Sequence, residues 1–289
     1  MMPTHILLKF ISKEKYLKEF LAGSLYMNTL YYFWNEFMLE DVKKGKRVPL
    51  SELGKNEKYG QLDLFEGTIG TIEAKNSPEM EKYMPTDICA RAIGCGYCNI
   101  LSFYRLDLTH SDFYVSYDLN NMASLGDFVV IIKDKDEFIR RISIAAEKEN
   151  YKFLCGNVSY WQAMKNGVPR DKRNAIICKS DDVIDIRNLN QRRDVFVKMD
   201  KYAYQNEWRL ALYRDVKETK AYRLEVGRLD DIIEWCPRKE ITNKIDDCLQ
   251  KGKIKFALNN WTGNISRKDM KELFYKLGDY KGELLLEIG

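Results

Sequence analysis

The order of its short apolar runs constrains the fold of this chain more than any other feature. Residues 5–11 read as a strand, 13–22 carry apolar side chains at helical spacing, and 25–33 again favour a strand. Residues 128–132 form an apolar strand that precedes another helix, and 207–212 alternate between two faces. Strands and helices do not alternate strictly. This order predicts an α+β fold with a mixed, largely antiparallel central sheet, flanking helices and a protruding insertion.

A change in composition along the chain predicts its domain organisation. Residues 41–86 are rich in Lys, Glu, Gly and Asn and show little periodicity, which is typical of an irregular insertion. We therefore expect three parts: an α+β core at 1–40 and 126–236, an inserted protruding subdomain with a cysteine cluster at 41–125, and a C-terminal helix-strand extension at 237–289.

Charge and hydropathy bear on the partners and the compartment. The 47 basic and 43 acidic residues give a net charge of +4, and the two signs are mixed along the chain. Proteins that bind nucleic acid concentrate basic charge on one face, so we expect no nucleic-acid partner. No apolar run approaches the roughly 20 residues that span a bilayer, and the N-terminal segment lacks the pattern of a signal peptide. We expect a cytoplasmic protein with free thiols and no membrane contact.

Histidine and cysteine usage limits the metal and nucleophile chemistry. The chain has two histidines, His5 and His110, and lacks the G-x-S-x-G and H-E-x-x-H motifs. Cys89, Cys95 and Cys98 have the spacing C-x5-C-x2-C and precede His110. Three thiolates and one imidazole match a tetrahedral zinc site, but structural zinc sites usually contain two paired knuckles. Free or interface thiols are therefore favoured, and zinc is the alternative.

Aromatic residues make up 12% of the chain and favour a contact surface. Protein interfaces are enriched in Tyr, Trp, Met and Arg, and one aromatic group, within 97–117, lies beside the cysteine cluster. A role in the core is the alternative for each aromatic residue. We predict an interface that contains Cys89, Cys95, Tyr97, Cys98, Phe103 and Tyr104.

A short polar motif stands at the start of the alternating strand. Gln205-x-Glu207 resembles the Q-x-E pattern of ADP-ribosyltransferases. In those enzymes a carboxylate at a strand edge contacts the nicotinamide ribose of NAD and stabilises an oxocarbenium-like transition state. The resemblance implies that NAD is the cofactor and that His5 and Tyr26 complete the catalytic site. The alternative is that Glu207 pairs with a neighbouring basic residue, Arg209 or Lys198, on an exposed strand face.

Three longer stretches, at 61–67, 125–142 and 196–209, resemble a family of phage and prophage proteins that is similar to the DUF2971 group. In its length and its phage-like character, the chain also resembles the phage inhibitors of Gabija, which encase a bacterial defence nuclease complex. The resemblance implies an anti-defence protein that forms a homo-oligomer around such a complex in the host cytoplasm, without catalysis, cofactor or metal. The NAD-dependent transferase is the alternative.

Overall fold

Among the residues that the structure describes, the main sheet contains nine strands. The computed structural model describes residues 4–33, 68–72, 88–92, 96–110, 115–116, 126–161, 175–177, 183–185, 194–214, 216–251, 253–254 and 284–288. Within these residues the main sheet consists of β1 (Thr4–Ile11), β2 (Ser24–Thr29), β5 (Asn99–His110), β6 (Val115–Ser116), β7 (Phe128–Ile132), β8 (Lys152–Asn157), β13 (Glu207–Tyr213), β14 (Tyr222–Glu225) and β15 (Ile233–Pro237).

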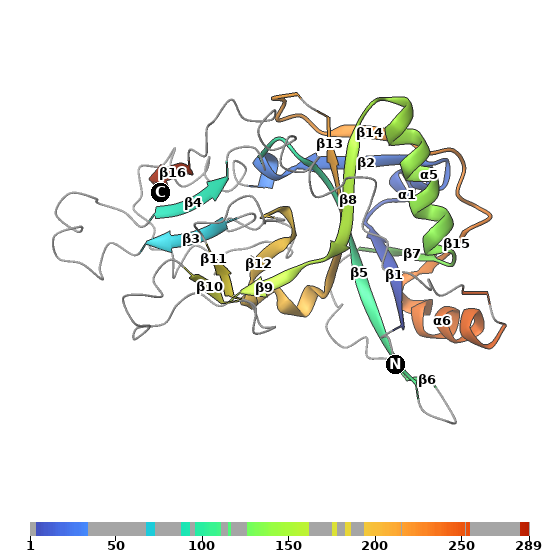
Figure 1. The fold of residues 1–289 in the computed structure, drawn as a ribbon. Helices are drawn as coiled ribbons and strands as arrows, with labels where there is room; N and C mark the ends of the chain where they lie inside the picture. The colour runs from blue at the N-terminus through green and yellow to red at the C-terminus, as the bar shows by residue number, and fades with distance from the viewer. Residues whose placement is uncertain are drawn as a thin grey trace.

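The pairings of this sheet confirm the α+β class with a largely antiparallel central sheet. Six strands follow the order β14-β2-β5-β1-β7-β15, while β13 and β6 also pair with β5, and β8 pairs with β13. All of these pairings are antiparallel. The long strand β5 therefore lies at the centre, with β1 and β2 on one side and β13 on the other (Figure 1).

Smaller sheets and helices complete the described structure. β9 (Ser159–Trp161) pairs in parallel with β12 (Val197–Met199), and the 3-10 helices η5 (Asp194–Phe196) and η6 (Asp200–Gln205) flank β12. The other small sheets are formed by β3 (Thr68–Ile72), β4 (Ile88–Ala92) and β16 (Leu284–Ile288), and by β10 (Ala175–Ile177) and β11 (Val183–Asp185). Among the described residues, the helices around these sheets include α1 (Glu14–Leu21), α5 (Lys135–Lys148), α6 (Ile241–Gln250) and the 3-10 helix η7 (Arg238–Glu240).

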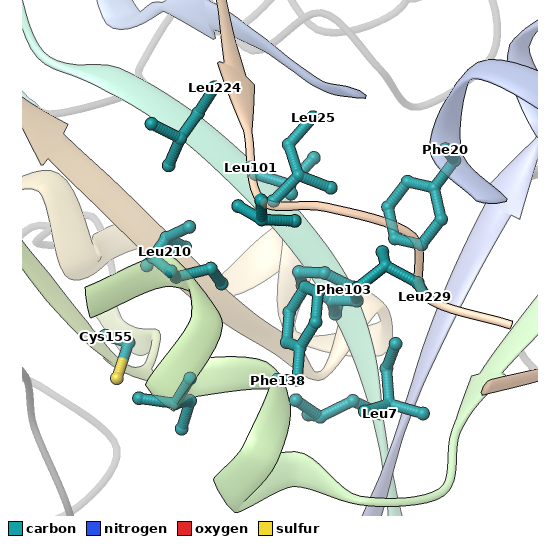
Figure 2. Packing of buried hydrophobic residues seen from close by; sticks show 14 of the residues in the cluster. Leu7, Phe20, Leu25, Leu101, Phe103, Phe138, Cys155, Leu210, Leu224 and Leu229 are labelled. Atoms are coloured by element: carbon teal, nitrogen blue, oxygen red, sulfur yellow. The ribbon is translucent and has the colours of Figure 1, made fainter. Parts of the chain in front are cut away.

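Three hydrophobic clusters cover the two faces of the main sheet. The first packs α1 and α5 against one face (Figure 2), with Phe20, Phe103 and Phe138 in mutual ring contact. The second cluster lies on the opposite face under α6 and includes Ile6, Leu8, Tyr104, Leu106 and Ile245. The third includes Leu30, Ile100, Phe196, Ala211 and Tyr213. Burial of these apolar side chains is the main contribution that stabilises the sheet.

A close backbone contact fixes the turn between α1 and β2. Gly23 has a φ of +90°, and a Cβ atom at this position would lie 1.8 Å from the carbonyl oxygen of Gly227. The amide of Val226 donates to the carbonyl of Gly23 at 2.9 Å, which brings the end of β14 against this turn. Only glycine fits both the left-handed conformation and the contact.

The structure departs from the predicted domain boundaries at β5. Residues 99–110 belong to the stretch 41–125 that the composition assigns to a protruding subdomain, yet they form the central strand of the core. The prediction is wrong for these residues, because an apolar strand near an irregular segment gives no sign of its distant partners. Most of 41–98 lies outside the described residues, so the subdomain itself stays a prediction. In the part of the chain that the structure describes, no helix is long and apolar enough to cross a membrane.

Candidate functional site

A pocket of about 270 Å³ lies on the sheet face opposite α1 and α5. Along β5, Ile100 belongs to the third cluster and Tyr104 to the second, while Ser102 between them belongs to neither. On β13, Arg209 lies opposite Ser102, and Glu207 lies opposite Tyr104. The pocket therefore occupies the place where polar side chains interrupt the apolar surface between two clusters.

The sheet is split at this pocket. β1 pairs with β5 as far as Leu8 opposite Tyr104, and β2 joins β5 at Ile100, so neither strand pairs with residues 101–103 in the described structure. Lys9 follows the last of these β1 pairs, and its Nζ donates to the carbonyl oxygen of Ser102 at 2.8 Å. A buried carbonyl needs a hydrogen-bond partner, so a lysine side chain here replaces the missing strand amide.

Three charged side chains, which we call the ion cluster, form one wall of the pocket: Lys198, Glu207 and Arg209. The Nζ of Lys198 lies 3.0 Å from Glu207 Oε2, and the Arg209 guanidinium donates to Glu207 Oε1 from Nε at 2.8 Å. Their side chains are 7%, 5% and 1% exposed, respectively. Lys198 also donates to Gln205 Oε1 at 2.7 Å. Two cations thus share one buried carboxylate, which leaves the cluster with a net charge of +1.

The ion cluster keeps its carboxylate charged. Burial raises the pKa of Glu207, but attraction by Arg209 and Lys198 and hydrogen bonds from Ser102 and Arg209 outweigh it, and they lower the pKa to about 2. Opposite charges at short range favour the ionised form of a carboxyl group. Glu207 is therefore an anion at neutral pH, and most of its hydrogen-bonding capacity is already used by the cluster.

Contacts from the smaller β9–β12 sheet hold the ion cluster in place. Lys198 lies opposite Tyr160 in the parallel β12–β9 pairing, and the Tyr160 hydroxyl accepts a hydrogen bond from the amide of Glu207 at 2.7 Å. Arg209 donates from Nη1 to the carbonyl of Val195 in η5. Because each charged residue is tied to a second element, the cluster is preorganised before any ligand binds.

Aromatic side chains form other walls of the pocket and its rim. Phe10 and Tyr104 line it from β1 and β5 and meet edge to face, with their ring centroids 6.4 Å apart. Tyr26 lines it from β2 and is 49% exposed, and the Arg223 guanidinium lies 5.2 Å from its ring centroid. The pocket thus combines charged and polar groups with aromatic surface.

The structure brings together part of the predicted transferase site. Gln205, Glu207 and Tyr26 all line the pocket. His5 is not part of it: its Nε2 lies 3.2 Å from Lys135 Nζ, and Lys9 is the basic residue that β1 places at the pocket. The alternative reading of Glu207 is half correct, because it pairs with both Lys198 and Arg209, but in a buried site and not on an exposed strand face.

The predicted interface and zinc residues have different environments. Cys98 and Phe103 are 1% and 2% exposed, and Tyr104 is buried as well, so these three are corrected from interface to core residues. Tyr97 is half-buried. Burial raises the pKa of the Cys98 thiol, whose Sγ lies 3.5 Å from the carbonyl oxygen of Leu212. Cys95 and the side chains of Cys89 and His110 lie outside the described residues, among which no group of potential metal ligands is present.

Sequence reasoning missed Lys9 and Ser102 as site residues. Lys9 interrupts the apolar run of β1, and Ser102 interrupts the apolar positions of β5. A charged or small polar residue within such a run is the signal that could have found them. In comparisons with family models, curated proteins and solved structures, no match to this chain is found.

Proposed function

We propose that this protein binds a compact anionic small molecule in the pocket beside the ion cluster. The observation that carries the proposal is the charge of the pocket lining: among the described residues, the two cations of the ion cluster, Lys198 and Arg209, line the pocket together with a single carboxylate, Glu207. Positive charge in the lining of a cleft attracts anions, so a carboxylate or phosphate group of a ligand is the natural complement.

The volume and the lining residues of the pocket indicate the size and chemistry of the rest of the ligand. A volume of about 270 Å³ is at the low end of small-molecule sites, which favours a single ring or a short chain over a large ligand. Phe10, Tyr104 and Tyr26 offer aromatic surface against which a planar or apolar group packs. The proposed ligand therefore carries one anionic group and one ring or apolar group.

Thermal unfolding in the presence of small anions tests this proposal. AMP, inorganic phosphate and NAD are compared with adenosine, which is neutral. A ligand at about ten times its Kd stabilises the folded protein by about 1.4 kcal/mol, which raises the Tm. We expect an anion to raise the Tm of the wild type, and to do so much less in Lys198→Met, while the exposed Lys251→Met behaves as the wild type. Equal shifts with adenosine, or no shift with any anion, would contradict the proposal.

An NAD-dependent transferase is the second candidate, because Gln205, Glu207 and Tyr26 line the same pocket. For this activity a nicotinamide ribose has to compete with Lys198 and Arg209 for the oxygens of Glu207. Release of nicotinamide from NAD by the wild-type protein tests it. If NAD binds but no nicotinamide is released, the result supports the anion site and contradicts the transferase activity.

The phage anti-defence role stays a prediction that rests on the sequence resemblance. The aromatic and thiol residues predicted for its contact surface include Cys98, Phe103 and Tyr104, which the structure buries. Co-expression with a Gabija system, followed by size-exclusion chromatography of the complex, tests whether several copies of this chain join the defence assembly in the cytoplasm.

A further inference from the structure

We propose that Lys9 is a nucleophilic amine, and that the ligand class of the pocket is an anion with an aldehyde or keto group that Lys9 holds as an imine. This inference rests on the proposed anion site: the ion cluster binds the anionic group, and the carbonyl carbon of the same ligand meets Lys9. Lys9 and all three members of the ion cluster line the one pocket.

The hydrogen-bond environment of Lys9 differs from that of Lys198. Lys198 contacts both the carboxylate of Glu207 and the side chain of Gln205, which holds its ammonium group. Lys9 Nζ donates to a neutral acceptor, the carbonyl of Ser102 at 2.8 Å, and no carboxylate of the described residues lies within 4.0 Å of it. The ring of Phe103 lies 5.9 Å from this nitrogen. An amine that can lose its proton without breaking an ion pair is the better nucleophile.

Burial of Lys9 adds to this difference. Burial lowers the pKa of Lys9 to about 8, although the charge of Glu207 acts in the opposite direction. A lysine with the ordinary pKa of about 10.4 has roughly two hundred times less free amine at pH 7. On the other side of β1, Lys9 lies opposite Val130 of β7, which carries no charge. Among the described residues, five other titratable or charged groups line the pocket with Lys9: Tyr26 of β2, Tyr104 of β5, Lys198 of β12, and Glu207 and Arg209 of β13.

Imine formation needs no further reactant. The lone pair of the Lys9 amine attacks the carbonyl carbon of the ligand, and the electron pair of the C=O bond moves to oxygen. After proton transfer from nitrogen to oxygen, the carbinolamine loses one molecule of water and a C=N bond forms. Water reverses the reaction. Borohydride adds hydride to the imine carbon and fixes the adduct as a secondary amine.

Pyridoxal 5′-phosphate is a suitable probe, because it joins an aldehyde and a phosphate on one ring. The protein is incubated with it, reduced with borohydride, digested, and analysed by mass spectrometry. We expect the adduct at Lys9 at least tenfold above that at the exposed Lys15, and a labelling rate at Lys9 that levels off above pH about 8, as the free amine does. Pyridoxal without phosphate should label Lys9 more slowly, because it lacks the group that the ion cluster binds.

Variants and a second probe separate this inference from the proposed function. Lys9→Arg should lose the adduct and still bind pyridoxine 5′-phosphate, which has no aldehyde, within about threefold of the wild type, while Lys15→Arg should retain the adduct. If the arginine variant does not fold, Lys9→Met should also lose the adduct, and its affinity for pyridoxine 5′-phosphate is then not used because this change removes a positive charge from the pocket. Labelling spread equally over surface lysines would overturn the role of Lys9 even if pyridoxine 5′-phosphate binds. Failure of both phosphate probes to bind would overturn the anion site as well.

Discussion

Replacement of Glu207 with glutamine should destabilise this protein far more than loss of a surface ion pair. Glutamine keeps nearly the same shape but removes the negative charge between Lys198 and Arg209, whose side chains are 7% and 1% exposed. The two cations then lose the buried carboxylate that both of them contact. Breaking a buried pair in this way costs about 3–5 kcal/mol. If Glu207 lay on an exposed strand face, which the sequence leaves open as an alternative, its replacement would cost little, so this prediction separates the exposed from the buried environment.

The lowered pKa of Glu207 predicts how this stability depends on pH. Folding lowers it from the ordinary value of 4.5 to about 2, because the attraction by Arg209 and Lys198 outweighs burial. The folded state therefore favours the charged carboxylate, and ionisation of Glu207 stabilises the fold. Since the folded pKa is the lower one, this stability is fully present above pH about 4.5 and is lost as the pH falls toward 2. In the glutamine variant, stability should depend less on pH in that interval.

Urea unfolding at pH 7, followed by tryptophan fluorescence, measures the difference. With a denaturant slope of about 3 kcal/mol per molar, a loss of 3 kcal/mol lowers the midpoint by about 1 M. Asp230→Asn is the control, because Asp230 pairs with Arg228 at the surface, where the two side chains are 47% and 81% exposed. Its midpoint should not change. A Glu207→Gln midpoint within about 0.3 M of the wild type would refute the reasoning.

Three further predictions concern the core. Gly23→Ala should abolish folding or lower the Tm strongly, since its Cβ would lie 1.8 Å from the Gly227 carbonyl oxygen. Gly227→Ala is the control: Gly227 has φ +77° but a Cβ there would meet no atom within 4 Å, so thermal unfolding should show a loss of only about 1–2 kcal/mol in stability. Asn99→Ala should cost about 2–3 kcal/mol in urea unfolding, because the Asn99 amide donates to Met27 and Lys220 carbonyls at 3.0 and 3.2 Å. Cys98 should resist iodoacetamide in the folded protein and react in urea, as mass spectrometry of the labelled peptide will show, because burial raises its thiol pKa.

The class of fold could be predicted from local patterns, whereas the position of the central strand could not. Alternation at 207–212 predicts β13, and the apolar run at 128–132 predicts β7, because both patterns follow from which faces of a strand are buried. β5 pairs with β1, β2 and β13, whose paired residues lie between 70 (Thr29 and Asn99) and 113 (Asn99 and Leu212) positions away along the chain. Such pairings depend on contacts that no local pattern encodes, so an expectation based on composition placed β5 in an insertion.

The site could be predicted from the sequence only where polar residues stood together. Gln205 and Glu207 form a recognisable motif at a strand start, and both line the pocket. A polar residue on an early strand points to His5, but His5 lies four residues from Lys9, which is about 13 Å along β1. Lys9 is a site residue because β1 stops pairing with β5 at Leu8, just before it. The position at which this pairing stops is a property of the tertiary structure.

The charge of the ion cluster links stability to binding, and the Glu207→Gln variant exposes that link. In the wild type the carboxylate offsets one of two buried cations, which supports folding but also weakens the attraction for an anionic ligand. The glutamine variant raises the net charge of the cluster from +1 to +2, so it should be less stable and yet gain more stability from AMP or phosphate. In a transferase that depends on the Glu207 carboxylate, the same change removes catalysis and gives no reason for tighter anion binding. A larger anion-induced rise in Tm in a less stable variant therefore favours the anion site over the transferase.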